Sequence, residues 1–248
     1  MPATPPQLYY ILGLDLGQAK DPSALAVLEQ SRLAPETPAN YACRDLRRWP
    51  LGTPYPQIVA EVTKLVKAPP LQGCELVIDG TGCGRAVVDL FRLSALDAAV
   101  RPVLITAGHA VSTDEHGYIH VAKVQLVSVM QVLFGTRRWK IAKSLPLTPT
   151  LEKELSTFTA KITTAGNETF AGDWREGEHD DLVLAAAIAA WVGENFAIGP
   201  FTMIEDRENR SVIAKAPQGV FLRPERDDDE DDKGDGDDDG HSAIHWPW

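Results

Sequence analysis

The chain has 248 residues, of which 44% are hydrophobic, and this is enough to bury one substantial core. No apolar run approaches the roughly 20 residues that a membrane-spanning helix needs, and residues 1–7 lack the basic and apolar regions of a secretory signal. Its three cysteines, Cys43, Cys74 and Cys83, are an odd and sparse set that does not indicate a disulfide framework. Without a CxxC pair or a nearby histidine pair, they do not indicate a zinc site either. We therefore expect one cytoplasmic domain with reduced thiols and no membrane partner.

The formal net charge of −11 argues at first against a nucleic-acid partner. Residues 226–239, however, hold ten of the 35 acidic residues and only two of the 24 basic ones. The rest of the chain has 25 acidic and 22 basic residues, a net charge of −3. Because lysine and arginine could still gather on one face of this nearly neutral part, the charge does not exclude nucleic acid.

The first part of the chain predicts three strands in series and then alternating helices and strands. Asp21 and Pro22 form a turn between the first two apolar runs, which predicts a hairpin. Apolar residues at helical spacing predict the helices, and short apolar runs predict the buried strands. The predicted elements are strands at 9–16, 23–28 and 41–49, a helix at 56–67, a strand at 75–79, a glycine-rich turn at 80–84, a helix at 85–93 and a strand at 101–106.

The second part predicts amphipathic helices at 123–134 and 150–158, a hairpin of 158–163 with 168–172, and a last helix at 178–196. This order favours an α/β fold with a mixed sheet and helices on its faces. The hydrophobic pattern fades after about residue 200. The expected division is a lead at 1–7, one domain at 8–200, an extension at 201–224 and a disordered acidic tail at 225–248.

Acidic residues stand at the ends of predicted elements. Asp15 ends the first strand, Asp79 ends the fourth, and Asp180 and Asp181 lie in the first turn of the last helix. In open sheets, sites form beyond the carboxyl ends of strands, so neighbouring first and fourth strands would direct both aspartates into one pocket. The helix N-terminus would add Asp180 or Asp181 if it faces that pocket.

Carboxylates gathered in this way repel each other and do not all stay ionised without cations. Mg²⁺ and Mn²⁺ favour oxygen ligands, and two such ions about 4 Å apart can activate a water and stabilise the leaving oxygen in phosphodiester cleavage. The alternative is structural, because an aspartate after a strand is often a turn residue and an acidic pair at a helix start suits the helix dipole. Only the joint placement of the four acids favours a metal site.

Three segments resemble motifs of the nuclease domain of phage terminase large subunits. The opening strand pair of that family resembles residues 13–30, GLDLGQAKDPSALAVLEQ. Its second acidic motif resembles 76–91, LVIDGTGCGRAVVDLF, and its third resembles 175–191, REGEHDDLVLAAAIAAW. The segment at 123–158 is similar to the family's intervening region, a helix that begins with lysine and then a Glu-Leu-x-x-Phe stretch at 154–158. The resemblance covers about residues 8–196.

The resemblance implies an RNase H-like fold, with three antiparallel strands followed by parallel strands in a mixed sheet flanked by helices. It also implies an endonuclease that hydrolyses double-stranded DNA with two Mg²⁺ or Mn²⁺ ions during packaging of phage or prophage DNA in the bacterial host cytoplasm. By matching position, Asp15, Asp79 and Asp181 would bind metal, with Asp180 as a fourth ligand.

The chain departs from this family at one point. Terminase large subunits carry an ATPase domain ahead of the nuclease, and this sequence has no GxxxxGK[ST] phosphate loop and no room for one before Tyr9. We therefore expect a nuclease that works with a separate ATPase, or a domesticated relative with another task.

Basic residues outside the acidic positions are candidates for contacts with DNA phosphates. Arg85 follows the glycine-rich turn, Lys123 opens a helix, Lys161 lies in the expected hairpin, and Arg137 and Arg138 form a small basic cluster. Each is equally explained as a solvated surface residue. The acidic tail at 225–248 is interpreted as solubilising, and the alternative is a DNA mimic whose deletion would raise DNA affinity at low salt.

Three other readings stay open. GLDLG at 13–17 and IDGTGCG at 78–84 also resemble the phosphate loops of nucleotide-binding domains of the actin and Hsp70 type, although those proteins need two such lobes. A Holliday-junction resolvase of the RuvC type shares the expected fold and acidic residues. A non-catalytic interaction protein would retain the fold, but buried like charges without a metal would be costly.

Overall fold

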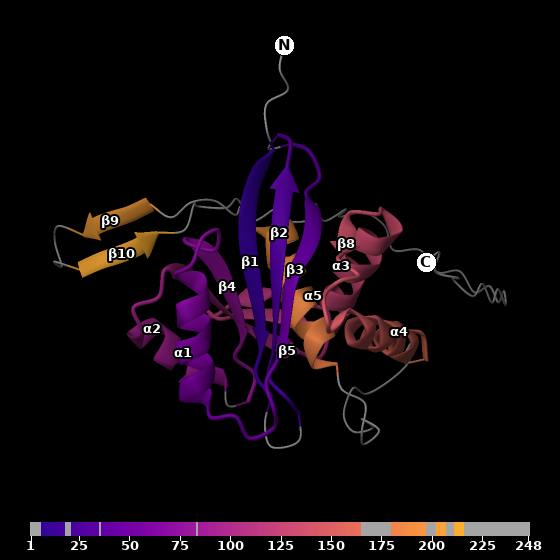
Figure 1. The fold of residues 1–248 in the computed structure, drawn as a ribbon, viewed down its shortest axis with the longest axis horizontal. Helices are drawn as coiled ribbons and strands as arrows, with labels where there is room; N and C mark the ends of the chain where they lie inside the picture. The colour runs from indigo at the N-terminus through magenta and orange to yellow at the C-terminus, as the bar shows by residue number, and fades with distance from the viewer. Residues whose placement is uncertain are drawn as a thin grey trace, which may run out of the picture.

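A computed structural model of the protein describes residues 6–17, 21–34, 36–82, 84–164, 180–196, 202–206 and 211–215, with side chains described in 6–156 and 180–196 of these ranges. Figure 1 shows a central sheet with helices on both sides. The strands are β1 (Gln7–Asp15), β2 (Ala24–Arg32), β3 (Asn40–Arg48), β4 (Cys74–Asp79), β5 (Ala98–Thr106), β6 (Ser112–Thr113), β7 (Ile119–Ala122), β8 (Trp139–Ile141), β9 (Thr202–Asp206) and β10 (Ser211–Lys215). The helices are α1 (Tyr55–Val66), α2 (Gly84–Leu93), α3 (Lys123–Gly135), α4 (Thr148–Thr164) and α5 (Asp181–Asn195).

The main sheet has eight strands in the order β6-β7-β5-β4-β1-β2-β3-β8. β1, β2 and β3 pair antiparallel, and β4 and β5 continue the sheet parallel to β1. Three antiparallel strands followed by parallel strands, with helices on both faces, are the RNase H-like arrangement. The fold class expected from the sequence is confirmed.

Strand alternation divides the core into two layers, because successive side chains of a strand point to opposite faces. On β1, Ile11 packs in the layer under α5, whereas Leu12 and Leu14 pack under α1 and α2. On β4, Val77 packs under α5, whereas Ile78 packs on the other face. By the same alternation, the residues that end these strands, Asp15 and Asp79, belong to the α5 face.

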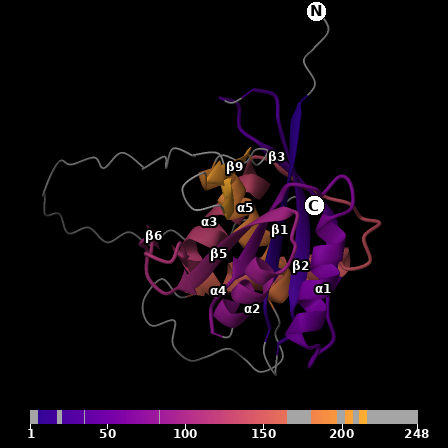
Figure 2. The ribbon, with the colours of Figure 1, turned by 90° about the vertical axis from the view of Figure 1, so that its left-hand side faces the viewer.

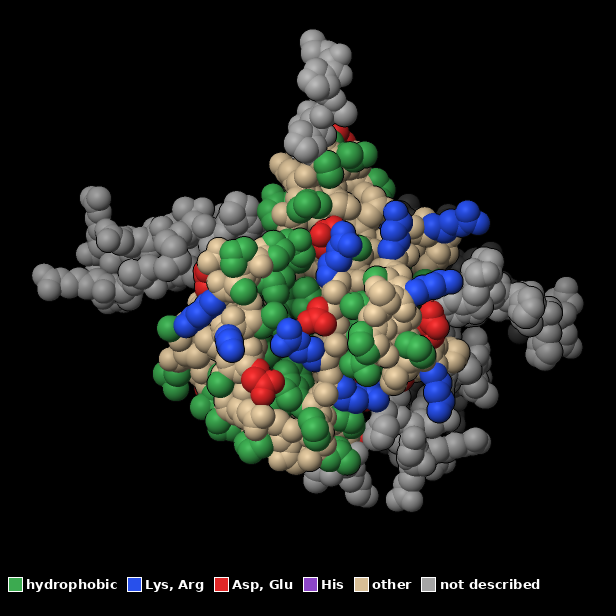
Figure 3. Space-filling view, viewed as in Figure 1, with side chains coloured by type: hydrophobic (Ala, Val, Ile, Leu, Met, Phe, Trp, Pro, Cys, Tyr) green, Lys and Arg blue, Asp and Glu red, His purple; other side chains and the backbone are tan. Residues whose placement is uncertain are grey.

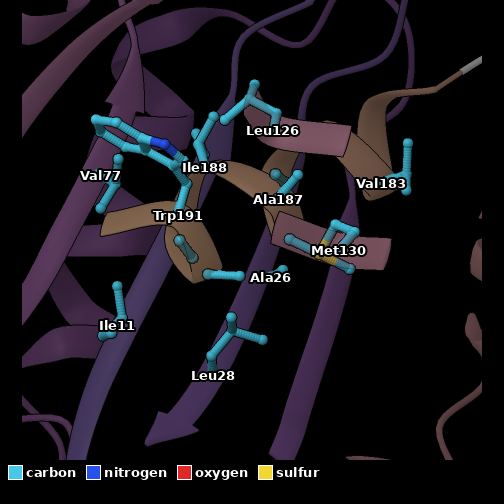
Figure 4. Packing of buried hydrophobic residues seen from close by; sticks show 14 of the residues in the cluster. Ile11, Ala26, Leu28, Val77, Leu126, Met130, Val183, Ala187, Ile188 and Trp191 are labelled. Atoms are coloured by element: carbon cyan, nitrogen blue, oxygen red, sulfur yellow. The ribbon is translucent and has the colours of Figure 1, made fainter. Parts of the chain in front are cut away.

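The α5 face is covered by α5 itself, with α3 and α4 outside it. Figure 4 shows Ala187, Ile188 and Trp191 of α5 packed above the sheet. The small residues of α5 permit a close approach, since a Cβ atom on Gly13 of β1 would lie 1.9 Å from the carbonyl oxygen of Ala185. The glycine of β1 and the alanine-rich sequence of α5 therefore belong to one packing arrangement.

The opposite face is covered by α1 and α2, which pack on each other and on the sheet. Figure 2 shows these two helices together in front of the strands. Ile58 and Val62 of α1 and Phe91 of α2 are fully or almost fully buried there. The helix pair closes the second layer of the core.

Some expectations from the sequence were wrong. The strand expected at 158–163 is part of α4, which continues to Thr164. The apolar residues at 151, 155, 158 and 162 have helical spacing as well as a short alternation, and a helix already formed upstream extends more readily than a new strand begins. β8 was not predicted as a strand, and the extension at 201–224 contains the hairpin of β9 and β10.

The second half of the expected hairpin, 168–172, lies outside the described residues, as do residues 1–5 of the expected lead and the acidic tail at 225–248. Among the described helices, none is both long and apolar enough to cross a membrane.

Candidate functional site

Asp15 and Asp79 meet at the carboxyl end of the central strands. β1 and β4 run parallel with Leu14 opposite Ile78, so the next residue of each strand is an aspartate on the α5 face. The two carboxyl groups lie close enough for each to shift the pKa of the other. Oδ1 of Asp79 also accepts a hydrogen bond from the backbone N–H of Thr81, at 2.8 Å, in the turn before α2. The expectation that the first and fourth strands are neighbours is confirmed.

The pKa values of both carboxyl groups are raised. Burial raises the pKa of Asp15 well above its usual value, and the charges of Asp79, Asp180 and Asp181 raise it further, whereas that of Lys123 lowers it. Burial also raises the pKa of Asp79, against the opposing effects of the hydrogen bonds from Thr81 and of the Asp15 carboxyl group. Two carboxyl groups placed this close together and partly removed from water do not both ionise readily.

The acidic pair at the start of α5 lies close enough to affect Asp15. Asp180 is the N-cap residue of α5, and Asp181 is its first helical residue, 2% exposed. Oδ2 of Asp180 lies 3.1 Å from Nζ of Lys123, the first residue of α3. Lys123 therefore stands among the predicted acids, paired with one of them, and its role as a phosphate contact stays a prediction.

Arg48 was not singled out in the sequence. It ends β3 and pairs with Ala24 of β2, which in turn pairs with Asp15 of β1. Nε of Arg48 lies 2.6 Å from Oδ2 of Asp181, and Nη2 lies 2.9 Å from Oδ1. The same guanidinium group bonds Glu154 of α4. A planar guanidinium that holds both oxygens of one carboxylate fixes its orientation.

Glu154 was noticed only as part of the Glu-Leu-x-x-Phe stretch. Its side chain is 5% exposed, and burial raises its pKa to about 7, with the charge of Asp181 adding to the rise. Arg48 and the backbone N–H of Val183 act in the opposite direction. Leucines at 151 and 155 bury the same face of α4, which is why the intervening glutamate reaches the interior.

The remaining DNA-contact candidates lie in different places. Arg85 is exposed in the first turn of α2, with its guanidinium carbon 5.2 Å from the centre of the Tyr118 ring. Arg138 bonds both carboxylate oxygens of Glu194, at 2.9 and 2.7 Å, near the C-terminal end of α5. Arg137 is exposed before β8, and the side chain of Lys161 lies outside the described ones.

The donor set suits a hard divalent cation, because all four acidic residues offer carboxylate oxygens and the neighbouring carboxylates raise the pKa of Asp15. Within the described ranges, no three histidine, cysteine, aspartate or glutamate side chains already converge as a metal cage. Asp180 and Asp181 instead bond to Lys123 and Arg48. A cation would therefore have to draw a carboxylate from its present partner toward Asp15 and Asp79.

The strand order and the carboxylates at the ends of β1, β4 and the start of α5 define an RNase H-like protein with an acidic centre. Its structure is similar to that of the large terminase nuclease from thermophilic phage G20c, with 20% identity, a TM-score of 0.47, and coverage of 74% of this chain and 81% of that one.

It is also similar to the human cytomegalovirus terminase nuclease domain soaked in Mn, at 12% identity and a TM-score of 0.44, covering 74% of this chain and 84% of that one. A further similar structure is the large terminase nuclease domain of bacteriophage SPP1 with bound Mn, at 14% identity and a TM-score of 0.42, covering 73% and 84%. No protein-family model and no curated protein sequence matches the chain. All three structures are terminase nuclease domains, the class of protein that the sequence resembles. Evidence for an activity has to come from the side chains of this chain.

Proposed function

We propose that the protein is a metal-dependent DNA endonuclease with its centre at Asp15, Asp79 and the Asp180-Asp181 pair. The observation that carries this proposal is the pair of carboxyl groups at the ends of β1 and β4, Asp15 half-buried and Asp79 buried, with raised pKa values and two more carboxylates at the adjacent helix start. A fold does not retain such repulsion for stability, because a neutral or apolar pair at the same place would cost less. Binding of divalent cations would explain why these carboxyl groups lie together.

Asp15 and Asp79 would hold the cation, with an oxygen of the acidic pair completing the protein ligands. Bound divalent ions, Mg²⁺ or Mn²⁺ and two in number, would activate a water and stabilise the leaving oxygen of a phosphodiester. Lys123 keeps Asp15 and Asp79 easier to ionise, since its charge lowers the pKa of both carboxyl groups. Thr81 fixes one oxygen of Asp79 through its backbone N–H.

Double-stranded DNA is the proposed substrate. Lys and Arg side chains are spread over the face shown in Figure 3 on both sides of the sheet, and they suit a phosphate backbone. Arg85 begins the helix that follows the Asp79 turn and is exposed beside Tyr118, so it is the basic residue that we propose for a phosphate contact. Packaging of phage DNA with a separate ATPase, in the cytoplasm of the host cell, is the proposed process.

The test is cleavage of a supercoiled plasmid in Mg²⁺ or Mn²⁺ by the wild type and by Asp79→Asn. We expect nicked and linear products from the wild type, their loss with a chelator, and a rate at least 10²-fold lower for the variant, the scale on which active-site groups contribute. Asp97→Asn, at an exposed aspartate before β5, is the matched control and should cut like the wild type. Equal cutting by Asp79→Asn would refute the proposed centre, and cutting of four-way junctions alone would assign the protein to the resolvases.

A further inference from the structure

The two adjacent acids of α5 have different surroundings. Asp181 has both carboxylate oxygens bonded to Arg48, and its side chain is 3% exposed. Asp180 bonds Lys123 through one oxygen, and its side chain is 22% exposed. Residues next to each other on a helix point about 100° apart, so the two carboxylates cannot point equally toward one metal site.

Glu154 caps the N-terminus of α5, a role that normally belongs to the side chain of the N-cap residue. An aspartate at an N-cap usually accepts hydrogen bonds from the first free N–H groups of the helix. Asp180 makes no such bond. Instead, Oε2 of Glu154 accepts the N–H groups of Leu182, at 3.0 Å, and Val183, at 3.1 Å. The carboxylate of Asp180 is therefore not required to hold the helix start together.

Arg48 links Asp181 to Glu154. Its guanidinium group bonds Asp181 on one side and Oε1 of Glu154 on the other, so β3, α4 and the start of α5 are fixed by one side chain. Glu154 and Asp181 are almost completely buried, and Arg48 supplies the positive charge between them. Two buried carboxylates with a shared cation form a fixed structural unit rather than a site waiting for a ligand.

Asp180 is the member of the pair that shares a cationic neighbour with Asp15 and Asp79. Its Oδ2 atom lies 3.1 Å from Nζ of Lys123. Lys123, its partner, also interacts with Asp15 and Asp79. Asp180 is thus paired with a cation that also acts on Asp15 and Asp79, whereas both oxygens of Asp181 are bonded to Arg48.

We propose that Arg48 and Glu154 are positioning residues that divide the acidic pair, so that Asp181 anchors α5 through Arg48 and Asp180 is the carboxylate that joins Asp15 and Asp79 on the cation. This inference rests on the proposed nuclease function and deepens it. It reverses the order that the sequence resemblance implied, in which Asp181 was the third ligand and Asp180 the fourth. Arg48 substitutes permanently for a metal ion at Asp181.

The first experiment compares Asp180→Asn with Asp181→Asn in the full chain. Mn²⁺ affinity is measured from the electron paramagnetic resonance signal of free Mn²⁺, and Tm is measured in chelator. For Asp180→Asn we expect Mn²⁺ affinity to fall at least 10-fold with no loss of Tm. For Asp181→Asn we expect Mn²⁺ affinity within about 3-fold of the wild type and a Tm lower by several degrees. These thresholds follow the 10–100-fold scale on which changes around metal ligands act.

The opposite pattern, with Mn²⁺ affinity lost only in Asp181→Asn, would overturn the division of the pair and leave the nuclease proposal intact. Equal loss in both variants would overturn it as well. A wild type that binds no Mn²⁺ and cuts no DNA would overturn the proposed function and this inference together.

A second experiment does not depend on folding of the Asp181 variant. Arg48→Lys keeps the positive charge but loses the planar pair of donors, and Arg48→Met loses both. We expect kcat for plasmid cleavage to fall about 10–100-fold in both variants, with Tm restored by lysine but not by methionine and KM for DNA unchanged. Full recovery of kcat along with Tm in Arg48→Lys would show that only a buried charge is needed, and the positioning role would be refuted.

Discussion

Asp15 and Asp79 end two neighbouring parallel strands in the same register, and each carboxyl group shifts the pKa of the other. Burial raises the pKa of both groups, and the neighbouring aspartates add to the rise at Asp15. The metal-free protein therefore carries an electrostatic cost at this point of the sheet.

Removal of the Asp15 charge should stabilise the metal-free protein. A carboxyl group whose pKa is raised by folding contributes stability at low pH that is lost as the pH rises above the unfolded value, 3.8 for Asp15. The free energy of unfolding of Asp15→Asn should therefore exceed that of the wild type only slightly near pH 4, and the difference should grow toward pH 7. Urea unfolding in chelator across this range measures it, with Asp97→Asn as the exposed control.

Mn²⁺ should reverse that advantage, because a ligand at 100 times its Kd stabilises the folded state by about 2.7 kcal/mol. The wild type should gain this stability, and Asp15→Asn should not. If Asp15→Asn were less stable than the wild type in chelator at pH 7, the Asp15 charge would not be destabilising in the metal-free protein.

Lys123 should set the pH at which the centre binds metal. Its charge lowers the pKa of Asp15 and Asp79, so Lys123→Met should raise both and require a higher pH before the carboxylates are ionised. Mn²⁺ affinity measured from pH 5 to pH 9 should rise at a higher pH in the variant than in the wild type. If the pH midpoint of Mn²⁺ affinity in Lys123→Met were unchanged or lower, the charge of Lys123 would not control the ionisation of Asp15 and Asp79.

The far end of α5 should matter for stability rather than for DNA. Arg138 and the Tyr41 hydroxyl both bond Glu194, about 20 Å along the helix from Asp181. Arg138→Met leaves this half-buried carboxylate short of a partner and should cost about 1–3 kcal/mol, or about 2–4 °C of Tm for each kcal/mol.

The matched control is Arg44→Met, which breaks the exposed pair with Glu29 and should cost less than about 1 kcal/mol. Plasmid affinity should be the same in Arg138→Met and the wild type at a fixed salt concentration. A loss of affinity without a loss of Tm would restore Arg138 to the DNA contacts expected from the sequence.

Arg85 should contribute a phosphate contact. Arg85→Ala should weaken binding of any DNA sequence and reduce the slope of log K against log salt by about 0.9, the value for one phosphate. Arg92→Ala is the matched control, because Arg92 contacts the same Tyr118 ring from the other end of α2. Equal slopes in Arg85→Ala and the wild type would remove Arg85 from the interface.

The central strands and the four acids could be predicted because their signals are local. β1 and β4 are apolar runs that each end in an aspartate, and the acidic pair stands at the first turn of an alanine-rich helix. Their placement beside one another required only that β1 and β4 be neighbours. The roles of the four acids remain predictions.

Arg48 could not be predicted because its direction depends on an irregularity between two strands. Tyr41 and Cys43 of β3 pack under α5, so regular alternation would place Arg47 there. The pairing of β2 with β3 shifts at Val27 and Leu28, where Arg44 is the extra residue, and this reverses the alternation. Leu46 and Arg48 then face α5. A short sequence of arginines before Trp49 contains no sign of this shift.

The most direct test of the metal centre is a crystal of the wild type soaked in Mn²⁺ and measured at the manganese absorption edge. We expect anomalous peaks between Asp15 and Asp79 with an oxygen of Asp180 among the ligands, Arg48 still bonded to Asp181, and no peak in Asp79→Asn. Well-ordered crystals of the wild type with no peak at Asp15 and Asp79, or a peak held by Asp181 with Arg48 displaced, would contradict it.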